Sequence, residues 1–173
     1  MTCAHGCSGP SFRDDVLDLQ LCVPCHVREH CGAQRVDLVV PAAVATLFVL
    51  GADSAVRQTA LTISDPLCDG QWRDLMVVRL NALHAISKVA RTQEQLAGPL
   101  RLNGSWRTLA AVLQAAVALQ VAVARRAIAT DDIDLERAER LQEAAEALNH
   151  LFYRVRAQRR LVLRHETEVS SAA

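Results

Sequence analysis

Aromatic residues and net charge are what this sequence has least of. Aromatics make up 3% of its 173 residues, although 51% of the residues are hydrophobic. Because Ala, Val and Leu fill the apolar class, the composition favours packed helices over a sheet sandwich, which would be richer in Tyr, Phe, Ile and Thr. The 19 basic residues balance the 19 acidic ones, so overall charge provides no case for a nucleic-acid or membrane partner.

Long hydrophobic segments are also missing. The longest uncharged stretch, Leu38 to Ala52, contains Pro41 and is too short to span a bilayer comfortably. The first residues carry no apolar core of the kind found in signal peptides. We therefore expect a cytoplasmic protein, in which clustered cysteines indicate metal binding or redox chemistry rather than structural disulfides.

Patterns typical of catalysis are scarce as well. We find no phosphate-binding loop, no Ser-His-Asp set and no pair of catalytic carboxylates with a supporting context. Glu139, Glu143, Glu146 and His150 have the spacing of one helix face, but a di-iron bundle would need Glu-x2-His motifs on two helices. A solvated helix face explains these four residues, and the sequence predicts a protein that is not an enzyme.

Cysteine, in contrast, is concentrated at one end. Five of the six cysteines lie in the first 31 residues, where Cys22 and Cys25 are followed by Cys31. Thiolates suit zinc and iron–sulfur clusters, and imidazoles can replace some of them at zinc. Four thiolates permit either group, whereas a mixed set favours zinc. The candidate metal ligands are Cys3, Cys7, Cys22, Cys25, Cys31, His5, His26 and His30.

The spacing of these cysteines points to one family. Zinc fingers and ribbons usually have two Cys-x2-4-Cys pairs, whereas here Cys22-x2-Cys25 is followed by Cys25-x5-Cys31. One upstream Cys, then Cys-x2-Cys-x5-Cys, with Val27-Arg28 after the second cysteine of the triplet, resembles the cluster-binding region of WhiB-like iron–sulfur transcription factors of actinobacteria. The resemblance covers residues 3–35. It implies a [4Fe-4S] cluster on Cys22, Cys25, Cys31 and either Cys7 or Cys3, and a redox-responsive regulator of transcription.

Two other interpretations of the cysteines stay open. In the first, a structural zinc ion attaches the N-terminus to a helical body that interacts with other proteins. In the second, Cys22-Val-Pro-Cys25 is the reactive pair of a thiol oxidoreductase. A thioredoxin-like enzyme would require a βαβ context, which the sequence around this pair does not have.

Helical periodicity and capping residues predict an all-α fold. We expect a short helix from Ser11, a second over Cys22 to Cys31, and longer helices over residues 37–50, 53–63, 71–96, 106–129 and 131–164. The last two should form a long antiparallel helical hairpin, because few residues join them. The predicted organisation is a Cys-rich metal or cluster unit at 1–35, a helical bundle at 36–165 and a frayed tail at 166–173.

The last predicted helix separates its charges. Residues 131–146 hold seven carboxylates: Asp131, Asp132, Asp134, Glu136, Glu139, Glu143 and Glu146. Residues 154–164 hold five arginines: Arg154, Arg156, Arg159, Arg160 and Arg164. Stabilisation of a long helix through its dipole explains this polarity. The functional alternative is a basic patch through which DNA is bound, beside a protein partner such as the transcription machinery.

Overall fold

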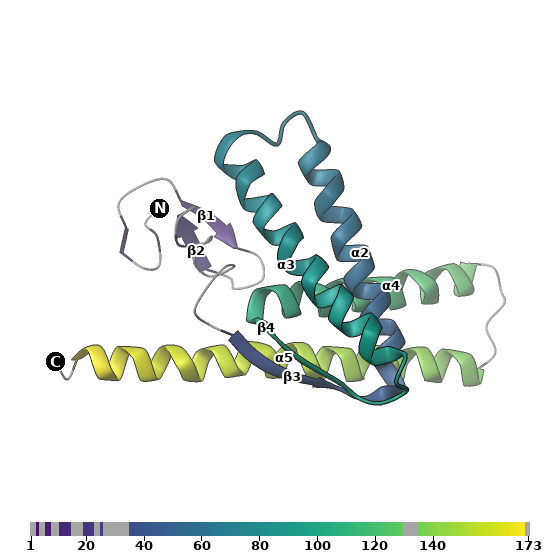
Figure 1. The fold of residues 1–173 in the computed structure, drawn as a ribbon. Helices are drawn as coiled ribbons and strands as arrows, with labels where there is room; N and C mark the ends of the chain where they lie inside the picture. The colour runs from purple at the N-terminus through teal and green to yellow at the C-terminus, as the bar shows by residue number, and fades with distance from the viewer. Residues whose placement is uncertain are drawn as a thin grey trace.

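The computed structural model shows four long helices and two small sheets in the part of the chain that it describes (Figure 1). It describes residues 3, 6–7, 11–14, 19–22, 25, 35–129 and 135–171. The elements are β1 (Ser11–Asp14), β2 (Leu19–Cys22), β3 (Arg35–Val40), the 3-10 turn η1 (Ala42–Val44), α2 (Ala45–Ser64), α3 (Gly70–Glu94), β4 (Leu100–Ser105), α4 (Trp106–Ala129) and α5 (Leu135–Ser171). The prediction of a mostly helical protein is confirmed, whereas its all-α form is wrong because the described residues include four strands.

The first sheet is a small hairpin near the N-terminus. β1 and β2 pair antiparallel, with Ser11 opposite Cys22 and Asp14 opposite Leu19. The helix predicted from Ser11 is therefore wrong. A helix of two turns is marginal in isolation, and these residues instead satisfy their backbone groups across the hairpin. Cys22 ends β2 and Cys25 has helical backbone, and the other residues of the helix predicted over 22–31 lie outside the described part.

The second sheet pairs residues that are 60 to 70 positions apart in the sequence. β3 pairs antiparallel with β4, with Arg35 opposite Ser105 and Val40 opposite Leu100. In both strands buried and exposed residues alternate, as the two-residue period of a half-buried strand requires. The helix predicted over 37–50 is thus wrong in its first part. Pro41 separates the end of β3 from the helical residues that follow.

Helices α2, α3 and α4 form the body, with α5 along one side (Figure 1). α2 is continuous through Asp53, where a new helix was predicted, and it ends at Ser64, one residue beyond the predicted end of that helix. α4 and α5 lie side by side and run in opposite directions (Figure 1). Their connection, 130–134, lies outside the described residues. α5 extends to Ser171, beyond its predicted end near residue 164.

One large core cluster fills most of the space between these elements, and a smaller one lies around Cys68. Trp106, Phe48 and Leu83 are fully buried, as are most apolar residues in the first half of α4. Among the described helices, only α4 is long and apolar enough to cross a membrane, and 56% of its apolar window is buried inside the protein. Such burial is typical of the central helix of a soluble protein.

Candidate metal centre

Two pairs of cysteines flank the N-terminal hairpin. Cys3 and Cys7 precede β1, while Cys22 closes β2 and Cys25 follows it. Because β1 and β2 are antiparallel, the end of β2 returns to the start of β1, and the two pairs meet. The four sulfur atoms all lie within 4.8 Å of one another, and the sulfurs of Cys7 and Cys25 are 3.4 Å apart.

The backbone between Cys3 and Cys7 forms a turn that lets the sulfur atoms lie close together. The amide of Gly6 donates a hydrogen bond of 2.9 Å to the carbonyl of Cys3, which closes a turn between the two cysteines. Gly6 has φ +72°, a left-handed conformation that side chains with a Cβ rarely adopt. Across the hairpin, the amide of Cys22 donates to the sulfur of Cys3 at 3.4 Å. Such bonds favour an electron-rich thiolate at Cys3.

The four cysteines pack against the helical body. Cys3, Cys22 and Cys25 are at most 6% exposed, and Cys7 is half-buried. The three buried cysteines and Leu21 belong to the same core cluster as Phe48 and the apolar residues of α4. The cysteine unit is therefore packed onto the bundle and shares its core.

The pKa of the Cys25 thiol reflects this environment. Burial, together with hydrogen bonding to Cys7 and the other neighbouring cysteines, raises the pKa of Cys25 to about 12. A metal-free Cys25 is thus a protonated thiol at neutral pH. Thiolates are the metal-binding form of cysteine, so an incoming ion must displace this proton. For Cys25 to act as the reactive thiol of an oxidoreductase, its pKa would need the opposite shift, since a lowered pKa activates such cysteines.

The arrangement of the sulfurs fits a metal ion. Zinc binds thiolates at about 2.3 Å in a tetrahedron, which places the sulfur atoms about 3.8 Å from one another. The four sulfurs within 4.8 Å need only small adjustments to reach this geometry. A four-iron cluster spreads its thiolates farther apart, because each one binds a different iron atom. All four donors are cysteines, so both kinds of group remain chemically compatible with the set.

The candidate ligands divide into two groups. The structure brings together Cys3, Cys7, Cys22 and Cys25. The other candidates, Cys31, His5, His26 and His30, lie outside the described residues, and their participation stays a prediction. The sixth cysteine, Cys68, is buried near the α2–α3 connection beside Leu75 and Met76. The sequence signal for this set of four is Cys3-x3-Cys7, which together with Cys22-x2-Cys25 makes two pairs of zinc-ribbon spacing.

A second concave region lies between α3 and β4. It has a volume of about 240 Å³ and an apolar wall from α3, including Val78, Ala82 and Val89. Its polar rim consists of Arg35, Asn103, Ser105 and Thr108, and these pair with one another. No Asp, Glu, His or Cys is among the described residues that line it. It thus offers no acid, base or thiol for chemistry.

Comparison of the chain with protein-family models, with curated proteins and with solved structures finds no match. The assignment of a metal site to the four cysteines therefore depends on the geometry of their sulfur atoms.

The conformation of Gly6 provides a first test of the site. In Gly6→Ala, an added Cβ would meet no atom within 4 Å, so the change acts through the left-handed φ alone. We expect a cost of about 1 kcal/mol, which corresponds to roughly fivefold weaker metal binding. Competition with a chelator of known affinity measures the change. Gly98→Ala, at an open position with an ordinary φ, should leave metal affinity unchanged.

Proposed function

We propose that this chain is a non-catalytic, cytoplasmic adaptor in which one zinc ion, held by Cys3, Cys7, Cys22 and Cys25, attaches an N-terminal hairpin to a helical body. The observation that carries the proposal is the meeting of four sulfur atoms within 4.8 Å, three of them buried. Structural zinc sites are closed, with four protein ligands and no open position for a substrate. A closed four-cysteine set supports a structural role rather than metal catalysis.

The small size of the hairpin explains why an ion is needed. β1 and β2 have four residues each, and an isolated two-stranded hairpin is marginally stable at best in water. Zinc binding to structural sites supplies about 10–16 kcal/mol, which becomes folding free energy when the site is absent from the unfolded chain. The ion would thus order the segment around β1 and β2 and hold Leu21 in the core. The resulting rigid surface, next to the exposed helices, is where we expect a protein partner to bind.

Metal analysis of the purified chain, of two serine variants and of a serine control tests this proposal. We expect one zinc ion per chain in the natural sequence and in Cys31→Ser, and loss of more than about 90% of the zinc in Cys3→Ser, because three remaining thiolates bind zinc far more weakly. Cys68→Ser is the matched control, since Cys68 is equally buried but lies outside the cluster. Zinc-free natural protein, or a Cys3→Ser variant with full zinc content, would contradict the proposal.

The second candidate is a WhiB-like regulator with a [4Fe-4S] cluster on Cys7, Cys22, Cys25 and Cys31. It is favoured by the Cys-x2-Cys-x5-Cys spacing and by Val27-Arg28. In this version the protein would respond to oxidants and contact the transcription machinery, with DNA bound by the arginines of α5. Anaerobic purification would then give a coloured, iron-containing protein. The same two variants would behave in the opposite way, with Cys31→Ser losing the cluster and Cys3→Ser keeping it.

A further inference from the structure

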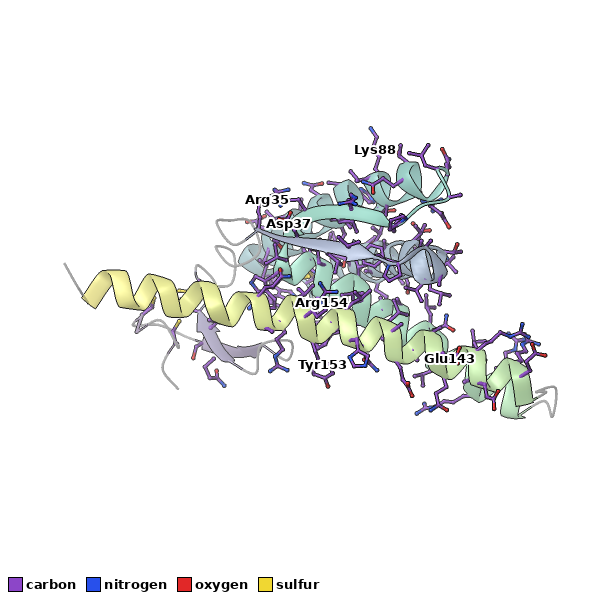
Figure 2. All side chains as sticks on the ribbon, turned by 90° about the horizontal axis from the view of Figure 1, so that it is seen from below. Arg35, Asp37, Lys88, Glu143, Tyr153 and Arg154 are labelled. Carbon is purple, nitrogen blue, oxygen red and sulfur yellow. The ribbon has the colours of Figure 1, made fainter. Side chains whose placement is uncertain are left out.

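Cys7 is the most accessible of the four clustered cysteines. Cys3, Cys22 and Cys25 are at most 6% exposed, whereas Cys7 is half-buried. The β1–β2 hairpin, which Cys7 precedes, lies at the edge of the molecule, outside the bundle of α2, α3 and α4, in Figure 1 and again in the turned view of Figure 2. A small solute can therefore reach the side chain of Cys7, while the other three cysteines are covered.

The sulfur of Cys7 also lies beside the sulfur of a second cysteine from the other end of the hairpin. Its distance to the sulfur of Cys25 is 3.4 Å, and the two residues are 18 positions apart in the sequence. The sulfur atoms of a disulfide are about 2.0 Å apart, so a further approach of about 1.4 Å brings this pair to bonding distance. The hairpin has thus already placed the two sulfurs for a cross-link.

Zinc binding keeps these sulfurs in the form that oxidants attack. Peroxides react with thiolates rather than thiols, and a cysteine that binds a metal ion is deprotonated. Susceptibility to oxidation follows thiolate character and exposure. When all four ligands are thiolates, the difference between them is exposure, and exposure favours Cys7. The sulfur of Cys3, in contrast, is covered and accepts a hydrogen bond from the amide of Cys22.

We infer that Cys7 is a site of oxidative modification, at which hydrogen peroxide joins Cys7 to Cys25 as a disulfide and releases the zinc ion. The inference rests on the proposed zinc site. The thiolate of Cys7 attacks one peroxide oxygen, the O–O bond breaks and hydroxide leaves, so that Cys7 becomes a sulfenic acid. The thiolate of Cys25 then attacks the sulfur of Cys7, the S–O bond breaks and a second hydroxide leaves. The two sulfurs have lost two electrons to the peroxide, and the hydroxides take up protons from solvent to become water.

Release of the ion follows from the loss of two ligands. Cys3 and Cys22 are then the remaining thiolates of the set, and two ligands hold zinc far more weakly than four. The disulfide encloses both strands of the hairpin, so the ends of the hairpin stay joined after the ion leaves. Thiol reductants restore the four thiols, which is typical of the transient, redox-sensing disulfides of a reducing cytosol. The chain thus responds reversibly to peroxide through the loss of its zinc.

Treatment of the zinc-loaded, full-length protein with hydrogen peroxide tests the inference. A colorimetric zinc indicator should show about one zinc ion released for each peroxide molecule consumed, because one disulfide takes two electrons. Mass spectrometry of unreduced peptides should find Cys7 joined to Cys25. Cys68, which is buried in a separate cluster, should remain a thiol. Dithiothreitol followed by added zinc should restore the original zinc content.

Two histidine substitutions separate oxidation from metal binding. Three cysteines and one histidine are an ordinary zinc-binding set, so both variants retain four ligands. Cys7→His removes the accessible sulfur and should slow the peroxide-driven release of zinc by at least about tenfold. Cys3→His is the matched control, because it makes the same ligand change but keeps the pair of Cys7 and Cys25. It should release zinc within about twofold of the natural rate.

Three results overturn the inference and leave the proposed function standing. They are a zinc-loaded natural chain that keeps its ion in peroxide, a first disulfide that lacks Cys7 or Cys25, and a Cys7→His variant that releases zinc as fast as the natural chain. If a histidine variant does not fold or bind zinc, the disulfide found in the natural chain decides. A natural chain that contains no zinc overturns the proposed function and this inference together.

Discussion

Removal of the metal ion is expected to unfold the N-terminal hairpin β1–β2 and to leave the helices folded. The hairpin has four residues in each strand and depends on the four-cysteine site, whose binding free energy is about 10–16 kcal/mol in comparable zinc sites. The bundle, in contrast, keeps Trp106, Phe48 and Leu83 in its own core. It loses chiefly the burial of Leu21 and of three cysteines, and Leu21 contributes about 2 kcal/mol.

Hydrogen exchange with and without a zinc chelator measures this difference. We expect the amides of β1 and β2 to lose protection almost completely, since without metal they open freely. The amides of α4 should remain protected, and the far-ultraviolet circular dichroism should fall only slightly. Cys68→Ser should respond to the chelator as the natural chain does. Loss of protection in α4 would mean that the ion holds the whole fold, and unchanged exchange in β1 would mean that no ion orders the hairpin.

Helices were the part of the fold that the sequence predicted best. α3 and α4 match the expected ranges closely, because each carries apolar residues at helical spacing over more than 20 residues. The strands were missed for a common reason. β3 and β4 are six residues long, and their paired residues are 60 to 70 positions apart in the sequence, so no local pattern reveals the partner. In the sequence, Val36 and Leu38 alternate with the polar residues Arg35 and Asp37. Val39 breaks this alternation and makes the segment continuous with the apolar residues that follow Pro41.

The cysteine site was predictable as a cluster but not as a set of four. Density alone indicated that the first 31 residues bind a metal or a cluster. Choosing the members required the hairpin, because the antiparallel return of β2 brings Cys22 and Cys25 to Cys3 and Cys7. A helix from Ser11, as the sequence predicted, would have placed the two pairs differently. Cys31 stays a prediction of the family resemblance.

α2 shows how tertiary contact overrides a local signal. Gly51 and Asp53 suggested a helix boundary, yet α2 runs through both residues. Gly51 stands where α2 crosses α4, and an added Cβ there would lie 2.6 Å from the Cβ of Ala116 and 2.7 Å from the carbonyl oxygen of Val112. The glycine is therefore a packing requirement of the α2–α4 contact, and the sequence of α2 alone carries no information about it.

Gly51→Ala is accordingly expected to destabilise the protein, although alanine is the better helix former. In an exposed helix the substitution would gain about 1 kcal/mol from helix propensity. Here the new methyl group meets backbone atoms of α4, which cannot rotate away, so the two helices must separate. Overpacking of this kind costs about 3 kcal/mol, at the upper end of the usual range, and the net loss of unfolding free energy should be about 2 kcal/mol.

Thermal and urea unfolding of metal-loaded protein test the sign of this effect. For a chain of this length the expected loss corresponds to a fall in Tm of about 4–8 °C. Gly98→Ala is the control, because its nearest neighbouring atom is 4.0 Å away and its φ is not left-handed, and it should change stability by less than about 0.5 kcal/mol. If Gly51→Ala proved as stable as the natural chain, α2 and α4 could not approach as closely as described, and the centre of the bundle would need a different packing.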